Sequence, residues 1–270
     1  MNKLILGLSV VVFSISCSSN DDENVPTDPV VEIPVLPTKL SFSNDTPATV
    51  KYDGNKISEI SYVGGKLVYE YTGNLITRIT EYSGSSVKEI TTDFSYSNDK
   101  LVKIVAVETN NSTKTTTYSY PDANSISFIE TRNYTSAGTP QVDKDVTTLT
   151  LNNGNIVAEE TTYSHNNSVA GKISSTYTYD DKKSVYSNVL GYDKIIAYNY
   201  STMDDITASK NNILTKNQTN TTVSGSLNKY KNVNTITYST AGYPTQIMTK
   251  QFSENNQQTD SYSISYEYNK

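Results

Sequence analysis

The chain has 270 residues, enough for one sizeable domain or two small ones, and its formal net charge is −6. Nucleic-acid binding and polybasic contact with a membrane surface both need a basic field, so this charge argues against both. A single Cys excludes an intrachain disulfide and argues against a cysteine-based zinc site. The 22 Tyr residues, against 5 Phe and no Trp, favour strands, because Tyr suits the half-exposed surface of a pleated sheet.

Residues 1–16 have the features of a secretory signal peptide. Lys3 supplies the positive start, and an apolar run of 12 residues extends from Leu4 to Ile15. That run is too short to cross a bilayer comfortably, since a spanning helix needs about 20 residues. We therefore predict export of the chain rather than a transmembrane helix at this position.

The signal ends at the only Cys of the chain. Ser14-Ile15-Ser16-Cys17 resembles the lipobox of bacterial lipoproteins, with Ser14 where the motif usually has Leu. The resemblance implies cleavage before Cys17, acylation of Cys17 with palmitate, and a lipid anchor in the outer membrane. The Ser-rich acidic run at residues 18–23 looks like the surface-export signal of Bacteroidota lipoproteins, which implies a position facing the cell exterior. The alternatives are an ordinary secreted protein with an incidental Cys, and a solvated linker after it.

Residues 17–39 are predicted to form an extended tether between the anchor and the folded part. Pro26, Pro29, Pro34 and Pro37 lie there among acidic and β-branched residues. Such a composition makes a semi-rigid spacer that buries too little apolar surface to fold alone. The folded domain is expected to occupy residues 40–270.

A short unit recurs through the folded part: an aromatic or aliphatic residue, a polar residue, then Tyr or Leu, then a turn. The copies are Tyr69-Glu70-Tyr71, Phe94-Ser95-Tyr96, Tyr118-Ser119-Tyr120, Leu149-Thr150-Leu151, Tyr177-Thr178-Tyr179, Ile236-Thr237-Tyr238 and Tyr266-Glu267-Tyr268. Most run into Gly, Asn, Asp or Pro, which suit tight turns, so each unit predicts one β-hairpin. The repeated rings indicate packing, with a platform for sugar rings or a partner protein as the alternative.

The strand after each tight turn carries apolar residues three positions apart. The pairs are Ile57 and Ile60, Ile76 and Ile79, Leu101 and Ile104, and Ile126 and Ile129. Residues three apart face opposite sides of a regular strand. The spacing therefore predicts either partial cover on both faces or a β-bulge that returns both residues to one face. A helix is rejected because the segments are short, rich in Thr and Val, and bounded by hairpin turns.

These units resemble YD-type (RHS-like) repeats: a Tyr, a turn, then an apolar pair separated by two polar residues. The matching stretches run from Tyr52 to Ile60, Tyr71 to Ile79, Tyr96 to Ile104 and Tyr238 to Ile247. With the lipobox and the acidic Pro-rich tether, nearly all of the chain after Cys17 is similar to Bacteroidota surface lipoproteins of unknown function. The resemblance implies an architecture and a location, and it implies no particular chemistry.

The predicted fold is all-β: an antiparallel meander of repeated hairpins with roughly 14 to 16 strands, forming a curled or barrel-like sheet that protects its edges. A membrane-spanning barrel needs an outward-facing apolar band. Lys, Glu, Ser and Thr interrupt both faces of these strands, so the sequence argues against a spanning barrel. Whether the sheet is open or closed is left undecided by the sequence.

The repeat is interrupted over about residues 182–232 by one irregular or helical excursion. Ser184 to Ile196 has a helix-like spacing of apolar residues, broken at Gly191, and a strand is expected near Lys210 to Gln218. Loops that leave a repeat scaffold often carry binding sites. The excursion is therefore interpreted as either a cap over the apolar face of the sheet or a binding site.

The sequence contains few groups that indicate catalysis. The adjacent acids are Glu159-Glu160, Asp180-Asp181 and Asp204-Asp205. Neighbours in a strand face opposite sides, and an Asp pair in a turn is explained by turn chemistry, so only Asp204-Asp205 is left for a hydrolase. His165 is the only His and is expected to be a solvated loop residue. We assign no catalytic residue, no metal ligand and no cofactor.

Three functional hypotheses follow from the sequence. The first is a membrane-anchored, surface-exposed lipoprotein with a non-enzymatic binding or scaffolding role. The second is a glycan-binding lipoprotein of an outer-membrane uptake system, and the third is a hydrolase using acids near Asp204. The expected partners are the membrane, through the lipid anchor, and a glycan or a surface protein. The candidate binding surface comprises Tyr192, Tyr198, Tyr200, Asp204 and Asp205.

Overall fold

The structure, a computed structural model, describes residues 33–43, 46–84, 86–198 and 208–270. The fold is that of residues 34–270, which form one compact unit. Its strands are β1 (Pro37–Phe42), β2 (Ala48–Asp53), β3 (Lys56–Tyr62), β4 (Gly65–Thr72), β5 (Leu75–Ser83), β6 (Val87–Ser97), β7 (Lys100–Glu108), β8 (Thr113–Asp122), β9 (Ser125–Ser136), β10 (Thr139–Asn152), β11 (Asn155–His165), β12 (Ser168–Tyr179), β13 (Ile213–Thr222), β14 (Leu227–Tyr238), β15 (Pro244–Ser253) and β16 (Gln258–Tyr268).

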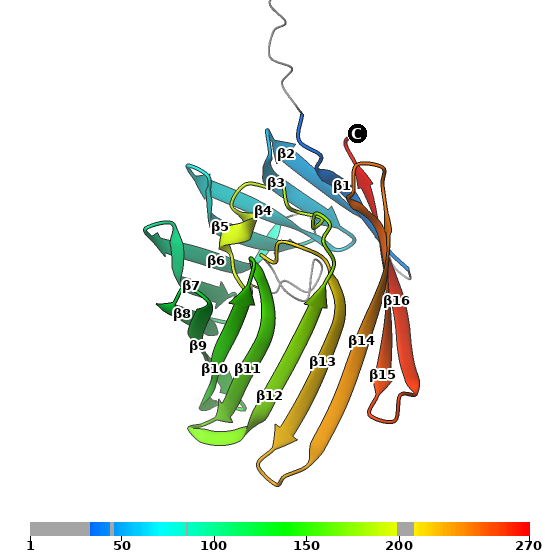
Figure 1. Cartoon of the computed structure of the whole chain (residues 1–270). Helices are drawn as coiled ribbons and strands as arrows, with labels where there is room; N and C mark the ends of the chain where they lie inside the picture. Colours follow the sequence, from blue (N-terminus) through cyan, green and yellow to red (C-terminus); the bar gives the residue numbers. More distant parts are fainter. Residues whose placement is uncertain (1–32, 44–45, 85, 199–207) are drawn as a thin grey trace, which may run out of the picture. The chain divides into compact units, whose positions relative to one another are not determined.

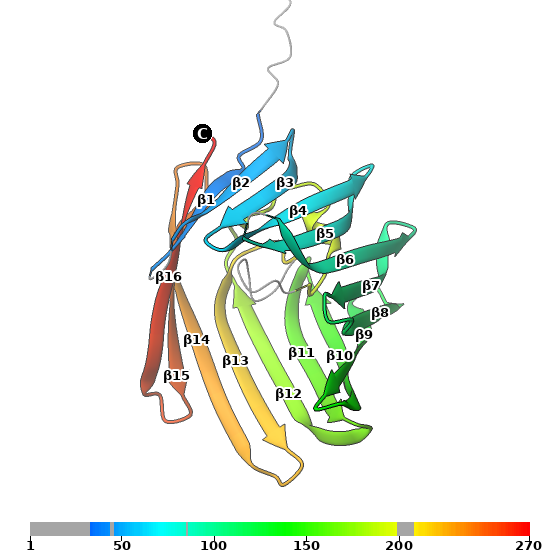
Figure 2. The same cartoon turned by 180° about the vertical axis from the view of Figure 1, so that it is seen from behind.

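The strands form one closed antiparallel barrel in which each strand pairs with its neighbours in the sequence (Figures 1 and 2). The barrel closes between the first and last strands, where Leu40 of β1 pairs with Tyr266 of β16. Closure removes the unpaired edges through which an open sheet would aggregate. The predicted all-β meander of hairpins is confirmed, and the sheet is closed.

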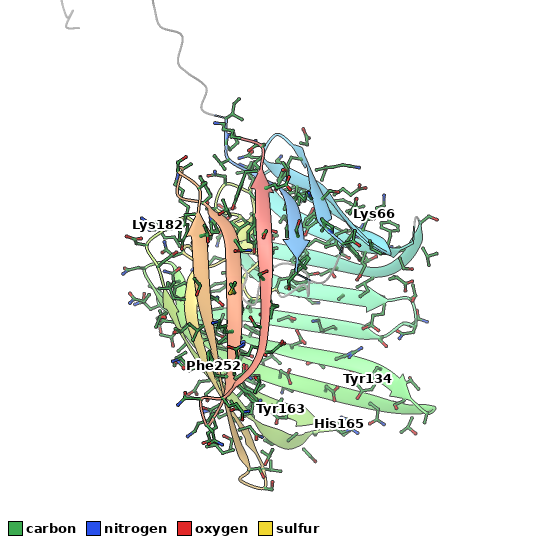
Figure 3. All side chains as sticks on the ribbon, turned by 90° about the vertical axis from the view of Figure 1, so that its right-hand side faces the viewer. Lys66, Tyr134, Tyr163, His165, Lys182 and Phe252 are labelled. Atoms are coloured by element: carbon green, nitrogen blue, oxygen red, sulfur yellow. The ribbon has the colours of Figure 1, made fainter. Side chains whose placement is uncertain are left out.

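The two ends of the barrel differ. The turns after β2, β4, β6, β8, β10 and β14 lie at the same end, because the strands alternate in direction along the meander. The chain also enters and leaves the barrel there, since Pro37 pairs with Tyr268. We call this the plugged end and the opposite end the far end. In Figure 3, Lys182 lies toward the plugged end, and His165 lies toward the far end.

A β-bulge follows each tight turn and explains the apolar residues three positions apart. In the first hairpin, Tyr52 pairs with Ile57 and Val50 with Ile60, and the register shifts between Lys51 and Tyr52. The extra residue in β3 returns both Ile side chains to the barrel interior, where each is fully buried. Register shifts recur beside Tyr71, Tyr96, Asp122, Leu151, Tyr179 and Tyr238. The bulge interpretation is confirmed for Ile57 and Ile60, Ile76 and Ile79, and Leu101 and Ile104, which are all buried. It is wrong for Ile126 and Ile129: the extra residue there lies in β8, Ile126 is buried and Ile129 is 42 % exposed, so the two face opposite sides of the sheet.

The tyrosine that closes a hairpin bonds to the backbone of a neighbouring hairpin. Tyr96 Oη donates a hydrogen bond to the carbonyl oxygen of Ile76 at 2.7 Å. The same contact recurs from Tyr52 to Pro37, Tyr120 to Leu101, Tyr179 to Ile156 and Tyr268 to Pro244. The first ring of the doublet is buried in the core, as at Tyr69, Phe94, Tyr118, Tyr177 and Tyr266. The repeated rings therefore pack the barrel.

The chain leaves the sheet between β12 and β13 and folds over the interior. We call its described residues 183–198 the plug. Val185, Tyr186, Val189 and Ile195 are buried in the core shared with the strands. The plug lies against the tight turns: the Leu190 N–H donates to the Asn55 carbonyl at 3.0 Å, and Tyr118 Oη donates to the Ile196 carbonyl at 2.9 Å.

The plug is irregular rather than helical. Its only regular element within the described residues is the 3₁₀ turn η1 (Tyr192–Lys194). Gly191 precedes it with φ 75°, a left-handed conformation that stops a helix from running through the segment. Across the described residues, no helix is long enough and apolar enough to cross a membrane.

The excursion is shorter than the predicted range of 182–232. Residues 213–222 and 227–238 are strands β13 and β14 of the barrel wall. The sequence predicted the first of these strands. The polar stretch that follows was assigned to the excursion, because this stretch lacks alternating apolar residues. Inward residues such as Gln218 and Asn220 need not be apolar here, because the interior far from the plug is polar, and Thr on the outer face suits a strand.

Candidate binding cavity

A cavity of about 810 Å³ lies inside the barrel between the plug and the wall formed by β13 to β16. Binding pockets for small molecules commonly occupy about 300–1,000 Å³, so the volume suits a drug-sized ligand. The cavity is bounded by the plug on one side and by inward-facing residues of the four strands on the other.

The part of the cavity near the plug is apolar. Val185 and Val189 of the plug face it and are almost completely buried. Ile247 of β15 and Ile264 of β16 form the opposite wall and pair with each other across the sheet. Burial of ligand surface between these two walls would stabilise binding by about 25 cal/mol per Å².

The part of the cavity farther from the plug is polar. Lys216 of β13 and Asn232 of β14 face it and pair across the sheet. Asn234, two residues along β14, donates to the Ile213 carbonyl at 2.9 Å and accepts a hydrogen bond from Thr249 at 2.8 Å. Asn234 is thus held in place, whereas Lys216 and Asn232 present their polar atoms to the space between plug and wall.

The charges around the cavity are unbalanced in favour of lysine. Lys210 and Lys216 line it, and Asp193 is the one carboxylate among the described lining residues. Asp193 is an exposed residue whose Oδ2 is 2.9 Å from Nζ of Lys194. Lys210 is exposed as well, so Lys216 is the half-buried cation of the described lining and the place where a negatively charged group would be favoured.

A polar cluster fixes the chain where it returns to the sheet after the plug. Asp180 accepts hydrogen bonds from the Asn212 N–H at 3.0 Å and from Tyr238 Oη. Burial, and then the contact with Asp180, raise the pKa of the Tyr238 phenol above its ordinary value. Asn211 bonds to Asn155 and to the Lys182 carbonyl. Asp180 is thus a structural residue, as its position in a turn suggested.

Two of the residues in the predicted binding surface are part of the packing. Tyr192 is 7 % exposed, lines the cavity and packs on Tyr186 with ring centroids 4.5 Å apart. Tyr198 packs edge-on against Phe94 at 5.0 Å, and burial raises its pKa to about 12. Tyr200, Asp204, Asp205 and the lipid-attachment residue Cys17 lie outside the described residues, so their roles remain predictions.

The adjacent glutamates lie as their strand position predicted. Glu159 faces the interior and accepts a hydrogen bond from Tyr177 at 2.7 Å. Glu160 faces outward and pairs with Lys172 at 2.9 Å. His165, at the end of β11, is half-exposed and lies 2.7 Å from Asp143. None of these residues lines the cavity.

Sequence reasoning missed one pair of inward-facing acids. Glu130 of β9 pairs across the sheet with Asp145 of β10. Burial, and then the charges of Glu130 and Asp143, raise the pKa of Asp145 above its ordinary value. Lys114 lies 3.3 Å from Glu130 and offsets its charge. The pair lies away from the cavity, and the described residues contain no group of three or more acid, His or Cys side chains able to hold a metal ion.

The outer face of the barrel carries charged pairs along the strands. Arg78 of β5 and Asp93 of β6 are paired at 2.6 Å, and both side chains are more than 40 % exposed. Glu59 of β3 accepts from both Lys51 at 2.8 Å and Lys66 at 3.0 Å. A lipid-facing band would make such charges costly. The outer face is therefore suited to water.

No protein-family model and no curated protein matches the chain. Among solved structures, a porin-like protein from Bacteroides vulgatus ATCC 8482 is similar, with a TM-score of 0.56 and 16 % sequence identity over 87 % of this chain and 99 % of that one. A porin-like protein from Bacteroides uniformis ATCC 8492 has a TM-score of 0.49 and 12 % identity over 86 % of this chain and 97 % of that one. The first likeness supports the closed barrel fold.

Proposed function

We propose that this chain is a lipid-anchored, non-enzymatic binding protein of the outer membrane, facing the cell exterior, and that the cavity beneath the plug holds its ligand. The cavity is the observation that carries the proposal. It combines an apolar wall with a few convergent polar groups, the usual composition of a binding pocket. Its single described carboxylate is ion-paired, so it lacks the two acids that a hydrolase needs, and we propose no reaction.

The start of the barrel supports a place of attachment for the lipid anchor. The Leu36 N–H donates to Asn269 at 2.9 Å, and Asn188 of the plug donates to the Val35 carbonyl at 3.0 Å. The chain therefore enters the barrel at the plugged end. A lipid anchor at Cys17 would therefore be connected to the barrel through this end. The water-suited outer face agrees with a barrel outside the bilayer.

Metabolic labelling with a palmitate analogue tests the anchor. We expect the wild-type chain to incorporate the label and to sediment with membranes, and Cys17→Ala to lose both properties. Ser18→Ala, one residue later, is the matched control and should behave as the wild type. Label that survives Cys17→Ala would overturn the proposed anchor.

A glycan is the second candidate ligand, because aromatic and amide side chains occur together in the cavity. Tyr192, Tyr266, Asn232 and Asn234 all line it. A glycan array probed with wild type, Asn232→Ala and Asn217→Ala tests this candidate. Asn217 is exposed, on the neighbouring strand β13, and faces away from the interior. Binding lost only in Asn232→Ala supports a glycan, and binding to no glycan counts against it.

A further inference from the structure

We infer that the cavity takes an amphipathic organic acid, whose acid group is held by Lys216 and Asn232 and whose apolar body lies between the plug and strands β15 and β16. This inference rests on the proposed function, since it names the class of ligand for the same cavity.

Lys216 is a cation that faces the interior without a carboxylate partner in the described part of the chain. Its side chain lies over the ring of Tyr177, with Nζ 5.9 Å from the ring centroid. No acid among the described residues is within ion-pair distance of it, although ion pairs are formed elsewhere by Lys39, Lys51, Lys66, Lys114 and Lys172. A half-buried ammonium gains most from a ligand that supplies the opposite charge.

Asn232 places a second polar group beside this lysine. It faces Lys216 across the β13–β14 pair, so the two side chains project from the same side of the sheet, about 5 Å apart at Cβ. Its amide has no hydrogen-bond partner in the part of the chain that the structure describes, in contrast to Asn234 on the next inward position. An ammonium and an amide N–H at this spacing can donate to the two oxygens of one carboxylate.

The lining between Lys216 and the plug includes apolar side chains that suit a hydrocarbon body. Thr249, Ile247 and Ile264 of the wall and Val189 of the plug line this part of the cavity. A ligand with its acid group at Lys216 therefore has apolar side chains on both sides of its remaining length. A cationic head group beside Lys216 would be disfavoured by charge repulsion.

Three ten-carbon probes with different head groups test the inference: decanoate, decanol and decyltrimethylammonium. Isothermal titration uses the full chain carrying Cys17→Ala, purified without detergent, so that no acyl chain or micelle competes for the probe. We expect decanoate to bind at least tenfold more tightly than decanol, and decyltrimethylammonium not to bind. Lys216→Met should weaken decanoate binding at least tenfold and leave decanol binding unchanged, while Lys216→Arg should retain decanoate binding.

The matched control is Lys231→Met, on strand β14, where the lysine is exposed and faces outward. It should leave all three affinities unchanged. Equal affinity for decanoate and decanol, or no effect of Lys216→Met in a chain that keeps its thermal midpoint, would overturn the acid ligand while the cavity remained a binding site. Failure of all three probes to bind would also overturn it.

A cavity-filling variant separates this inference from the proposed function. Ile247→Trp projects an indole into the space between plug and wall. Decanoate binding abolished by Ile247→Trp and weakened by Lys216→Met supports both claims. Decanoate binding that survives Ile247→Trp would place the probe elsewhere on the chain and would overturn both.

Discussion

A tyrosine hydroxyl repairs the hydrogen bonding that each bulge disturbs. A bulge leaves a backbone group without its partner in the ladder. Tyr96 reaches across to the carbonyl of Ile76, the first residue of the apolar pair Ile76 and Ile79. The same donation recurs at Tyr52, Tyr120, Tyr179 and Tyr268, so the closing Tyr contributes its hydroxyl as well as its ring. Leu151 stands in place of Tyr at one position and has no hydroxyl to donate.

Removing one such hydroxyl should destabilise the barrel measurably. In Tyr96→Phe the Ile76 carbonyl loses its partner while the ring stays in place, at a cost of about 1–2 kcal/mol in the free energy of unfolding. Urea denaturation of the full chain measures it. Tyr230→Phe is the control, because Tyr230 is 47 % exposed and should cost almost nothing. Equal effects of the two substitutions would contradict this role of the hydroxyl.

Glu59 is the residue whose charge should most affect stability at low pH. Hydrogen bonds from Lys51, then Lys66, then Ser61 lower the pKa of its carboxyl from 4.5 to about 2 in the folded chain. A lowered pKa stabilises the fold above the unfolded-state pKa, and this contribution is lost as the pH falls through the folded-state pKa. The three contacts are therefore fully effective at neutral pH and ineffective near pH 2.

The difference in urea midpoint between wild type and Glu59→Gln tests this sign. We expect a full difference at pH 7, a smaller one at pH 3, and little at pH 2. Glu267→Gln, which removes a single exposed partner of Lys39, should change the midpoint less at pH 7. A difference for Glu59→Gln that grows on acidification would contradict the assignment.

Among the elements, the plug depends on one close backbone approach. A Cβ placed on Gly191 would lie 2.6 Å from the Asn74 carbonyl oxygen, and Gly191 also has a left-handed backbone conformation. Gly191 thus lets the plug sit directly on the β4–β5 turn. The carbonyl belongs to that turn, so it cannot move aside without disturbing the hairpin.

Gly191→Ala should therefore cost more than a positive-φ glycine normally does. We expect a loss of about 1–3 kcal/mol in unfolding free energy from backbone strain alone, with the clash in addition. Gly242→Ala is the matched control, since Gly242 also has a positive φ but nothing lies within 4 Å of its added Cβ. Thermal or urea denaturation compares the two. Equal destabilisation would show that the plug does not press on the turn.

The elements were predictable where local chemistry decides them. Tight turns are predicted by Asp53-Gly54, Gly64-Gly65 and Gly73-Asn74. The bulge is predicted by the spacing of Ile57 and Ile60. The sequence predicted that the chain leaves the sheet at the plug, but not the plug's conformation. Its apolar residues are spaced as in a helix, whereas contacts with the β2–β3 and β4–β5 turns determine its structure. The first part of β14 was missed because its inward residues face a polar interior and carry no apolar signal, whereas Thr235 to Tyr238 was expected as a strand.

On the scale of the whole molecule, closure could not be read from the sequence. Closure requires Leu40 of β1 to pair with Tyr266 of β16. Whether they meet depends on the strand registers and bulges of the whole sheet together, and no local sequence pattern specifies this. The cavity is a second consequence of closure. Lys216 and Asn232 face the plug only because the closed barrel surrounds it. The Thr- and Asn-rich sequence around them contains no motif that predicts a binding site.

The most direct test of the binding cavity is native mass spectrometry of the mature protein purified from the membranes of the cells that make it. We expect a stoichiometric small-molecule adduct that is released on denaturation and is absent from Ile247→Trp. A wild-type protein without any adduct, or an adduct retained in full by Ile247→Trp, would contradict a ligand in the cavity beneath the plug.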